Sequence, residues 1–308
     1  MPRASFSSSV AFVASVSFVT FVSFVRPPEA SAQTSDLVGV RALGMGGAFT
    51  AVADDATATW WNPAGLAGGA YFSAILEYAH PTDRPGEGLR GVALGFPALG
   101  LSYYRLPLSQ IQPTSPTGAA AGSRKDEGGL SVFGATVGQS IGKYLVVGST
   151  VKLLRAAETK GGLDMGAMAV FGRTRVGLMV RNVTEPEFGS GLEAIKLHRH
   201  ARAGAAISSG TRGVIGEATV AVDADLVKTP AVGGDERRVA AGGELWLLSR
   251  RVGLRGGVSA STIGTRRAAP SAGASVALRP ATFVDAEVTG GGPDEGRRGW
   301  GVALRVTF

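Results

Sequence analysis

The sequence predicts an all-β fold: a transmembrane, antiparallel, up-and-down β-barrel of about 14 strands, with an N-terminal hatch segment inside its lumen. Three observations predict it. A leader-like N-terminus is followed by no long apolar helix, the residues from Ala70 onward form segments of alternating polarity, and a glycine-rich stretch lies between the two. We therefore expect a signal peptide over 1–32, a hatch over 33–69 and a barrel over 70–308.

The N-terminus has the three parts of a secretory leader. Arg3 precedes an apolar run from Val10 to Val25, and Ala30-Ser31-Ala32 forms an A-x-A cleavage site, so we expect cleavage after Ala32. The apolar run is shorter than the roughly 20 residues that a spanning helix needs. If the exported chain enters a membrane, it must do so as a closed barrel, because only that arrangement pairs every backbone group without helices.

Composition excludes several classes of function. The chain has no cysteine, so it can form neither a disulfide framework nor a thiolate zinc site. Its formal net charge is +7, but the basic residues are scattered, which argues against nucleic-acid binding. Gly44 to Gly47 do not form a nucleotide-binding motif. His198 and His200 would share a strand face and could bind a metal, yet ordinary surface positions are favoured. We expect no cofactor and no enzymatic activity.

The stretch from Arg41 to Gly69 indicates a folded plug. Gly44, Gly46 and Gly47 allow positive φ or close backbone approach. Asp54 and Asp55 precede a helix-tolerant run over 56–61 and are candidate N-caps or salt-bridge partners, which we favour over general acid/base catalysis because no nucleophile accompanies them. Pro63 disfavours helical geometry at Asn62, so the helix should stop there.

This ordering, GMGGAFTAVADDATATWWNPAGLA, resembles the N-terminal signature of the FadL and PorV/PorQ superfamily of bacterial outer-membrane β-barrels. The resemblance implies a hatch inside a fourteen-stranded barrel in the outer membrane. We assign to the hatch signature the residues Gly44, Gly46, Gly47, Asp54, Asp55, Asn62, Pro63 and Ala64.

The barrel wall is predicted from alternating segments of apolar and polar residues. These cover Ala70–Ala79, Arg90–Phe96, Ala98–Arg105, Gly129–Gln139, Lys143–Arg155, Leu163–Phe171, Thr174–Arg181, Arg199–Ser208, Val214–Leu226, Arg238–Leu248, Arg251–Ala260, Ser271–Leu278, Ala281–Thr289 and Trp300–Phe308. Tight turns alternate with longer links, as in outer-membrane barrels with short periplasmic turns, so both termini should be periplasmic.

Alternation also assigns the two faces of the wall. We expect the apolar face to contact outer-membrane lipid and the polar face to line the lumen, where charged residues either pair with one another and with the hatch, which we favour, or form an ion-selective pore. The expected lumen-facing residues are Lys152, Arg175, Arg181, Arg202, Glu217, Asp223, Asp225, Glu244, Arg251, Arg255, Asp285, Glu287 and Arg305. The last strand carries Trp300 and Phe308 on its apolar face and resembles a signal for the barrel-assembly machinery.

Three functions remain open. PorV/PorQ-like members act with secretion components or exported proteins, and FadL-like members conduct hydrophobic small molecules such as fatty acids or aromatic hydrocarbons. We favour the first, because the third link, Ala156–Gly162, is too short for a hydrophobic capture groove and the long second link, Leu106–Gly128, is polar. A soluble exported β-protein is the third alternative.

Overall fold

The computed structural model describes residues 38–82, 88–107, 129–189, 195–210, 215–231, 234–264, 268–291 and 298–308. The chain divides into two compact units, Met1–Ala30 and Ser31–Phe308, and every described residue belongs to the second. The predicted leader, its cleavage point and most of the second link therefore lie outside the described residues. Within the described ranges, no helix combines the length and the apolar character needed to cross a membrane.

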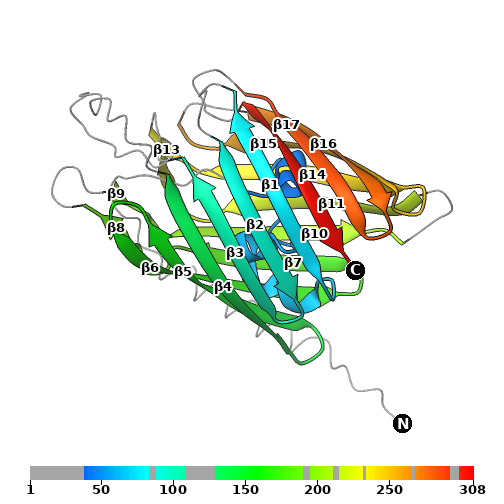
Figure 1. Ribbon diagram of the computed structural model, residues 1–308, viewed down its shortest axis with the longest axis horizontal. Coiled ribbons are helices and arrows are strands. Elements are labelled where there is room, and N and C mark those ends of the chain that lie inside the picture. Colours follow the sequence, from blue (N-terminus) through cyan, green and yellow to red (C-terminus); the bar gives the residue numbers. More distant parts are fainter. Residues whose placement is uncertain are drawn as a thin grey trace, which may run out of the picture. The chain divides into compact units, whose positions relative to one another are not determined.

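Fourteen strands pair into one closed antiparallel barrel, which confirms the predicted fold class (Figure 1). Each strand pairs with its neighbours along the chain, and β1 closes the ring by pairing with β18. The wall strands are β1 (Ser73–Pro81), β2 (Leu89–Phe96), β3 (Leu99–Leu106), β4 (Leu130–Ile141), β5 (Leu145–Arg155), β6 (Thr159–Phe171), β7 (Thr174–Arg181), β10 (His200–Ser208), β11 (Ile215–Asp225), β14 (Arg238–Leu247), β15 (Val252–Ser261), β16 (Ala268–Arg279), β17 (Thr282–Thr289) and β18 (Gly299–Thr307).

The links between strands differ from the prediction in two ways. β6 begins at Thr159, because residues 159–162 pair with β5 even though they lack alternating apolar side chains, and the third link shrinks to 156–158. Two small hairpins also form in the links: β8 (Glu187–Phe188) with β9 (Ile195–Lys196), and β12 (Thr229–Ala231) with β13 (Gly234–Glu236). Because neighbouring wall strands are antiparallel, the strand ends that lead into the longer links lie at one end of the barrel, which we call the long-link end, and the tight turns lie at the opposite, short-turn end.

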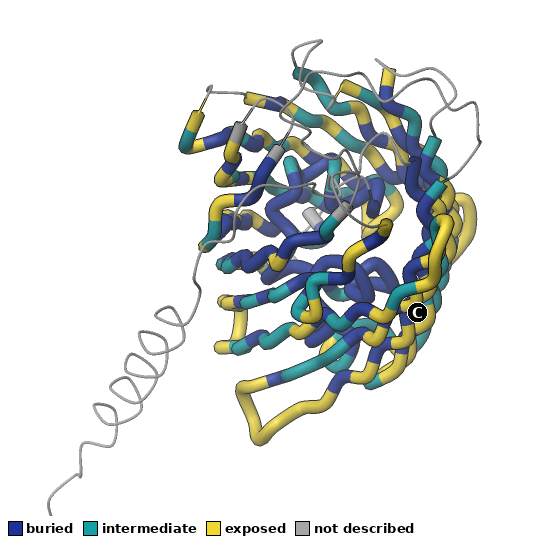
Figure 2. Tube along the Cα trace, turned by 90° about the vertical axis from the view of Figure 1, so that its left-hand side faces the viewer, coloured by how far each residue is buried: buried dark blue, intermediate teal, exposed yellow. Residues whose placement is uncertain are grey.

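Buried and exposed residues alternate along the strands of the wall (Figure 2). In β11, Val220 and Val222 are exposed, whereas Thr219, Asp223 and Asp225 are buried. The same alternation gives the outer surface many exposed apolar side chains and the lumen many buried charges, the reverse of a soluble sandwich.

Residues 38–69 fold inside the wall, and we call them the hatch (Figure 2). They form α2 (Val40–Gly44), α3 (Ala58–Trp61) and the 3-10 helix η1 (Pro63–Gly68). α2 packs against β15 to β18, and η1 packs mainly against β4 to β6. The hatch therefore contacts opposite sides of the wall through two different helices.

The helix boundaries in the hatch correct one prediction. The N-cap of α3 is Thr57, not Asp54 or Asp55, because the helix starts later than expected. Asp55 instead accepts hydrogen bonds from N and Oγ1 of Thr57 (2.9 and 2.5 Å). The predicted end of the helix at Asn62 is confirmed: this residue is extended (φ −161°, ψ 104°) before Pro63.

Candidate functional site

Two carboxylates of the wall hold the hatch through its backbone. Glu77 of β1 accepts hydrogen bonds from the N–H groups of Gly39 and Val40 at 3.0 and 3.2 Å. On the far side of the lumen, Asp223 of β11 accepts from the N–H groups of Phe49 and Thr50 at 3.1 and 2.9 Å. Each carboxyl group accepts from two backbone N–H groups, so these contacts fix both the entry and the middle of the hatch.

Arg41 of α2 is the charged centre of the hatch. Its Nε and Nη2 atoms donate to both oxygens of Glu244 on β14 (2.8 and 2.7 Å), and its Nη1 atom donates to Asp54 and Asp55 (2.5 and 3.1 Å). Burial opposes ionisation of Asp54, but Arg41 and then Arg175 hold the pKa of this carboxyl below its usual value. The sequence analysis missed Arg41 because a single basic residue beside a glycine run carries no motif.

The ion pairs continue from Arg41 around the wall, through β14, β15, β17 and β18. Glu244 also accepts from Arg255 Nε (2.6 Å), Arg255 Nη2 lies 3.6 Å from Asp285, and Asp285 accepts from Arg305 Nε (2.7 Å). The guanidinium groups of Arg255 and Arg305 both lie 5.6 Å from the ring of Trp246. Charges of both signs alternate here, so the lumen at this level is filled by paired groups.

The signature residues of the hatch lie where its backbone turns or meets the wall. Gly46 and Gly47 have positive φ (68° and 80°). Asn62 Nδ2 donates to the carbonyls of Thr50 (2.8 Å) and Ala167 (3.2 Å), and its Oδ1 accepts from the N–H of Ala64 at the start of η1. A Cβ atom added at Gly44 would lie 3.3 Å from the Cα atom of Gly273. Pro63 lies in the first turn of η1, and Ala64 is fully buried.

The wall meets the hatch through glycines. A Cβ atom at Gly257 of β15 would lie 2.3 Å from the carbonyl carbon of Met45, and one at Gly242 of β14 would lie 2.1 Å from the oxygen of the same carbonyl. Five wall glycines share this property, that an added Cβ atom would collide with the hatch, and we call them the glycine belt. They are Gly148, Gly166, Gly177, Gly242 and Gly257, on β5, β6, β7, β14 and β15. At four of these glycines the nearest hatch atom belongs to the backbone, and at Gly166 it is the side-chain oxygen of Asn62.

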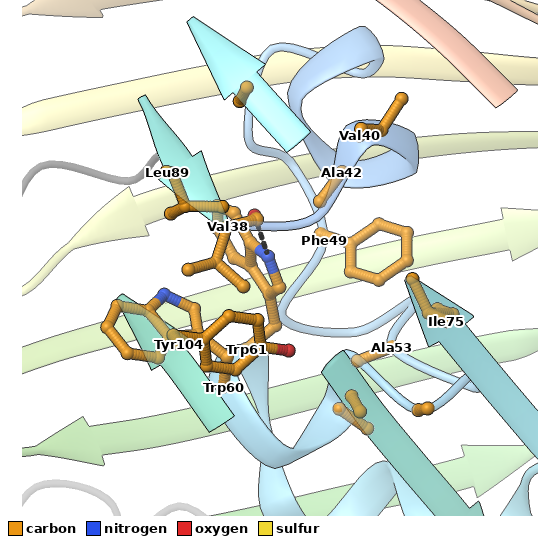
Figure 3. Close-up of a cluster of buried hydrophobic side chains, with 14 of the residues drawn as sticks. Val38, Val40, Ala42, Phe49, Ala53, Trp60, Trp61, Ile75, Leu89 and Tyr104 are labelled. Atoms are coloured by element: carbon orange, nitrogen blue, oxygen red, sulfur yellow. Dashed lines mark hydrogen bonds between the residues drawn. The ribbon is translucent and has the colours of Figure 1, made fainter. Parts of the chain in front are cut away.

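Buried apolar side chains of the hatch and the wall form one large cluster (Figure 3). We call the part of it that lies at the long-link end the outer cluster. Its residues belong to one group of buried, contacting side chains that spans three parts of the chain. The hatch contributes Val38 and Trp60, the wall contributes Leu89, Tyr104, Leu106, Leu130, Val132 and Leu154, and the fourth link contributes Phe188 and Leu197. The β8–β9 hairpin thus supplies the apolar cover that the short third link does not.

Trp60, a member of the outer cluster, is flanked by two cationic side chains and one aromatic ring. Lys152 Nζ and Arg181 Cζ lie 4.8 and 4.7 Å from its ring, and Tyr104 packs edge-on at 5.4 Å. Lys152 pairs with Asp164, and Arg181 Nη2 donates to the Trp60 carbonyl (3.1 Å). Trp60 Nε1 has no hydrogen-bond partner in the described part of the chain.

The structure also places the other residues that were predicted to face the lumen. Arg202 and His200 both bind Asp225 (2.7 and 2.8 Å) in the lumen, and Glu287 accepts from Thr289 Oγ1. Arg175 lies 3.5 Å from Asp54, and half-buried Glu217 pairs with exposed Arg250 at 2.8 Å. Arg251 is predicted wrongly: it is exposed in the turn before β15, because that strand begins at Val252.

Two further predictions concern the outer surface and metal binding. Trp300 and Phe308 point away from the lumen and are 42% and 65% exposed. The expected surface positions of the two histidines are wrong, because His198 and His200 are only 3% and 2% exposed. The imidazole of His200 is engaged by Asp225, and His198 Nδ1 lies 3.7 Å from Glu185. The described residues contain no group of three or more His, Cys, Asp or Glu side chains arranged to hold a metal ion.

Comparison with known proteins supports the architecture. No protein-family model matches the chain, and no curated protein sequence matches it. Similar solved structures include the CymD monoaromatic hydrocarbon channel (13% identity, 88% of this chain and 97% of that chain covered, TM-score 0.56). The toluene transporters TbuX of Ralstonia pickettii and TodX of P. putida each match 88% of this chain and 98% of their own, at 13% and 11% identity and TM-scores of 0.55 and 0.53.

These similarities agree with the observed topology, a closed ring of fourteen antiparallel strands. At this level of identity they carry information about the fold alone. The chain therefore has the fold of the FadL-type outer-membrane β-barrels.

Proposed function

We propose that this protein is a channel of the bacterial outer membrane that admits a small hydrophobic molecule from the long-link end. The observation that carries the proposal is the outer cluster, because it joins Phe188 and Leu197 of the fourth link to Trp60 of the hatch through one continuous set of apolar side chains. Binding sites for small hydrophobic ligands are lined in this way, with few polar groups. Three similar structures are a hydrocarbon channel and two toluene transporters, which supports the same function.

The location follows from the same proposal. The leader over 1–32 directs export, with cleavage after Ala32, and outer-membrane lipid covers the apolar outer face that includes Val222 and Leu304. Phe308 and Trp300 at the last strand are the residues through which the barrel-assembly machinery would recognise the chain. The long-link end then faces outward and both termini face the periplasm.

The docking function of PorV/PorQ-like barrels, favoured by the sequence alone, gains no support from the comparisons. That preference rested on the shortness of the third link and on the polar character of the second link, most of which lies outside the described residues. The fourth link removes the first argument, because its residues Phe188 and Leu197 supply apolar cover instead.

Uptake into cells tests the proposal. Bacterial cells that express the barrel should take up radiolabelled toluene faster than cells that carry an empty vector. Phe188→Asp should lower the initial rate severalfold, because a charge in the outer cluster disfavours apolar solutes. Glu187→Asp is the matched control, since the neighbouring Glu187 is exposed. Uptake equal to the empty vector, with an exported protein co-purifying through the outer links, would instead support the docking function.

A further inference from the structure

The tight turns at the short-turn end carry exposed basic side chains, which we call the turn cations. They are Lys143 between β4 and β5, Arg173 between β6 and β7, Arg250 and Arg251 between β14 and β15, and Arg279 at the end of β16. The described residues of the tight turns include no aspartate and no glutamate. The short-turn end of the barrel therefore presents positive charge to its surroundings.

Most of this charge has no partner within the described chain. Arg250 pairs with Glu217 at 2.8 Å, whereas the other turn cations form no ion pair with any described residue. At the long-link end, by contrast, the exposed Lys228 pairs with Asp235 at 2.5 Å. The turn cations thus leave a counter-charge to be supplied from outside the described chain.

Apolar side chains of the outer face lie directly beside the turn cations. Phe171 is 56% exposed and precedes Arg173 by two residues. Tyr144 stacks on Phe171 at 5.6 Å, and Lys143 Nζ lies 5.2 Å from the centre of the Tyr144 ring. The turn cations on the other side of the wall follow two exposed leucines, Leu248 and Leu278. Aromatic rings and long basic side chains occur together where the apolar core of a membrane meets its headgroups.

We propose that the turn cations bind the anionic headgroups of phospholipids such as phosphatidylglycerol. The lipids belong to the leaflet beside the short-turn end, which the proposed orientation makes the periplasmic leaflet of the outer membrane. Their headgroups supply the missing counter-charge, and their acyl chains cover Phe171, Leu248 and Leu278. An acidic soluble protein would match the charge but not the apolar side chains beside it.

Fluorescence quenching by brominated lipids tests the inference on the full-length barrel, refolded in liposomes of phosphatidylcholine. Tyr144→Trp places a reporter beside Lys143, and Trp300→Phe removes the only exposed one of the four native tryptophans. At equal mole fractions, brominated phosphatidylglycerol should be preferred over brominated phosphatidylcholine next to the reporter by about fivefold, the effect of one basic residue near an anionic surface. The preference should disappear in about 1 M NaCl, where the Debye length is only about 3 Å.

Matched variants of the reporter protein show which charges matter. Lys143→Gln with Arg173→Gln should abolish the preference, and Lys143→Arg with Arg173→Lys should keep it, because the charge is retained. Arg90→Gln with Arg155→Gln removes two exposed charges at the long-link end and should leave the preference unchanged. Heat-modifiable electrophoresis checks that each variant is folded.

Three results would overturn the inference. They are equal quenching by the two lipids in the reporter protein, an unchanged preference after Lys143→Gln with Arg173→Gln, and an equal loss after Arg90→Gln with Arg155→Gln. The turn cations would then be solvated surface charges. Uptake of toluene tests the channel proposal separately, so none of these results changes it.

Discussion

Replacing Gly257 by alanine tests whether the glycine belt seals the hatch. The new Cβ atom would lie 2.3 Å from the Met45 carbonyl carbon and 2.5 Å from Gly46 N, whereas ordinary contacts begin at 3.4 Å, so hatch and wall must separate by about 3.4 − 2.3 = 1.1 Å. Both contacted atoms are backbone atoms and cannot rotate away. Overpacking of this kind costs about 1–3 kcal/mol. A middle value of about 2 kcal/mol would raise the equilibrium constant for hatch release about 30-fold.

Thiol labelling measures that release directly, because the chain has no cysteine of its own. A reporter, Ala48→Cys, lies in the fully buried part of the hatch. Its reaction with a water-soluble maleimide should be about 10- to 100-fold faster in the Gly257→Ala background. Gly256→Ala is the matched control, since a Cβ atom at this adjacent position meets no atom within 4 Å. Equal labelling rates in the two backgrounds would refute the idea that close backbone contact holds the hatch in place.

Three further predictions concern the outer face, the barrel seam and the charged centre of the hatch. Val222→Arg should lower the free energy of unfolding of the barrel in liposomes by about 2–4 kcal/mol if the site is near the midplane of the membrane, as measured by urea titration. Val222→Leu is the control and should leave the free energy of unfolding unchanged. Equal losses for the two variants would contradict the outward orientation of Val222. Phe308→Asp should lower the yield of heat-modifiable barrel and Phe308→Tyr should not, because the Phe308 ring packs 5.2 Å from Phe72; unchanged yield with aspartate would refute this role. The pKa of Asp54 is lowered by Arg41, so the stabilisation from this pair is present above about pH 4, the ordinary carboxyl pKa, and is lost as the pH falls through the lowered pKa. The labelling rate of the Ala48→Cys reporter is divided at each pH by that of the same protein unfolded in urea, because the reactive thiolate becomes scarcer as the pH falls. This ratio should rise on acidification, and adding Asp54→Asn should raise it already at neutral pH. A ratio independent of pH in the reporter protein without Asp54→Asn would contradict this.

The wall was predictable because its signal is local. Val220, Val222 and their polar neighbours alternate with the period of a strand, and the same pattern repeats around the ring. Predicted boundaries failed where pairing does not depend on alternation. The glycines at 161 and 162 join β6 because β5 lies beside them, and this shortened the third link on which the favoured function had rested.

The lumen was less predictable because its contacts join residues far apart in the sequence. Arg41 meets Glu244, and Trp60 meets Lys152 and Arg181, and no spacing rule connects such positions. Alternation identified Glu244 and Lys152 as lumen-facing residues, but it could not name their partners. The apolar role of Phe188 was also hidden, since a two-residue strand inside a polar link gives no periodic signal.

The hydrogen bonds between Phe72 and Phe308 constrain how the molecule is assembled. The N–H of each residue donates to the carbonyl of the other (2.9 and 3.0 Å), so the seam of the ring begins only a few residues after the hatch ends at 69. Because only a few residues join the hatch to β1, the hatch has little freedom to enter the lumen after β18 has paired with β1. The final strand pairing is therefore also the step that encloses the hatch, and the order of events during biogenesis is built into the connectivity of the chain.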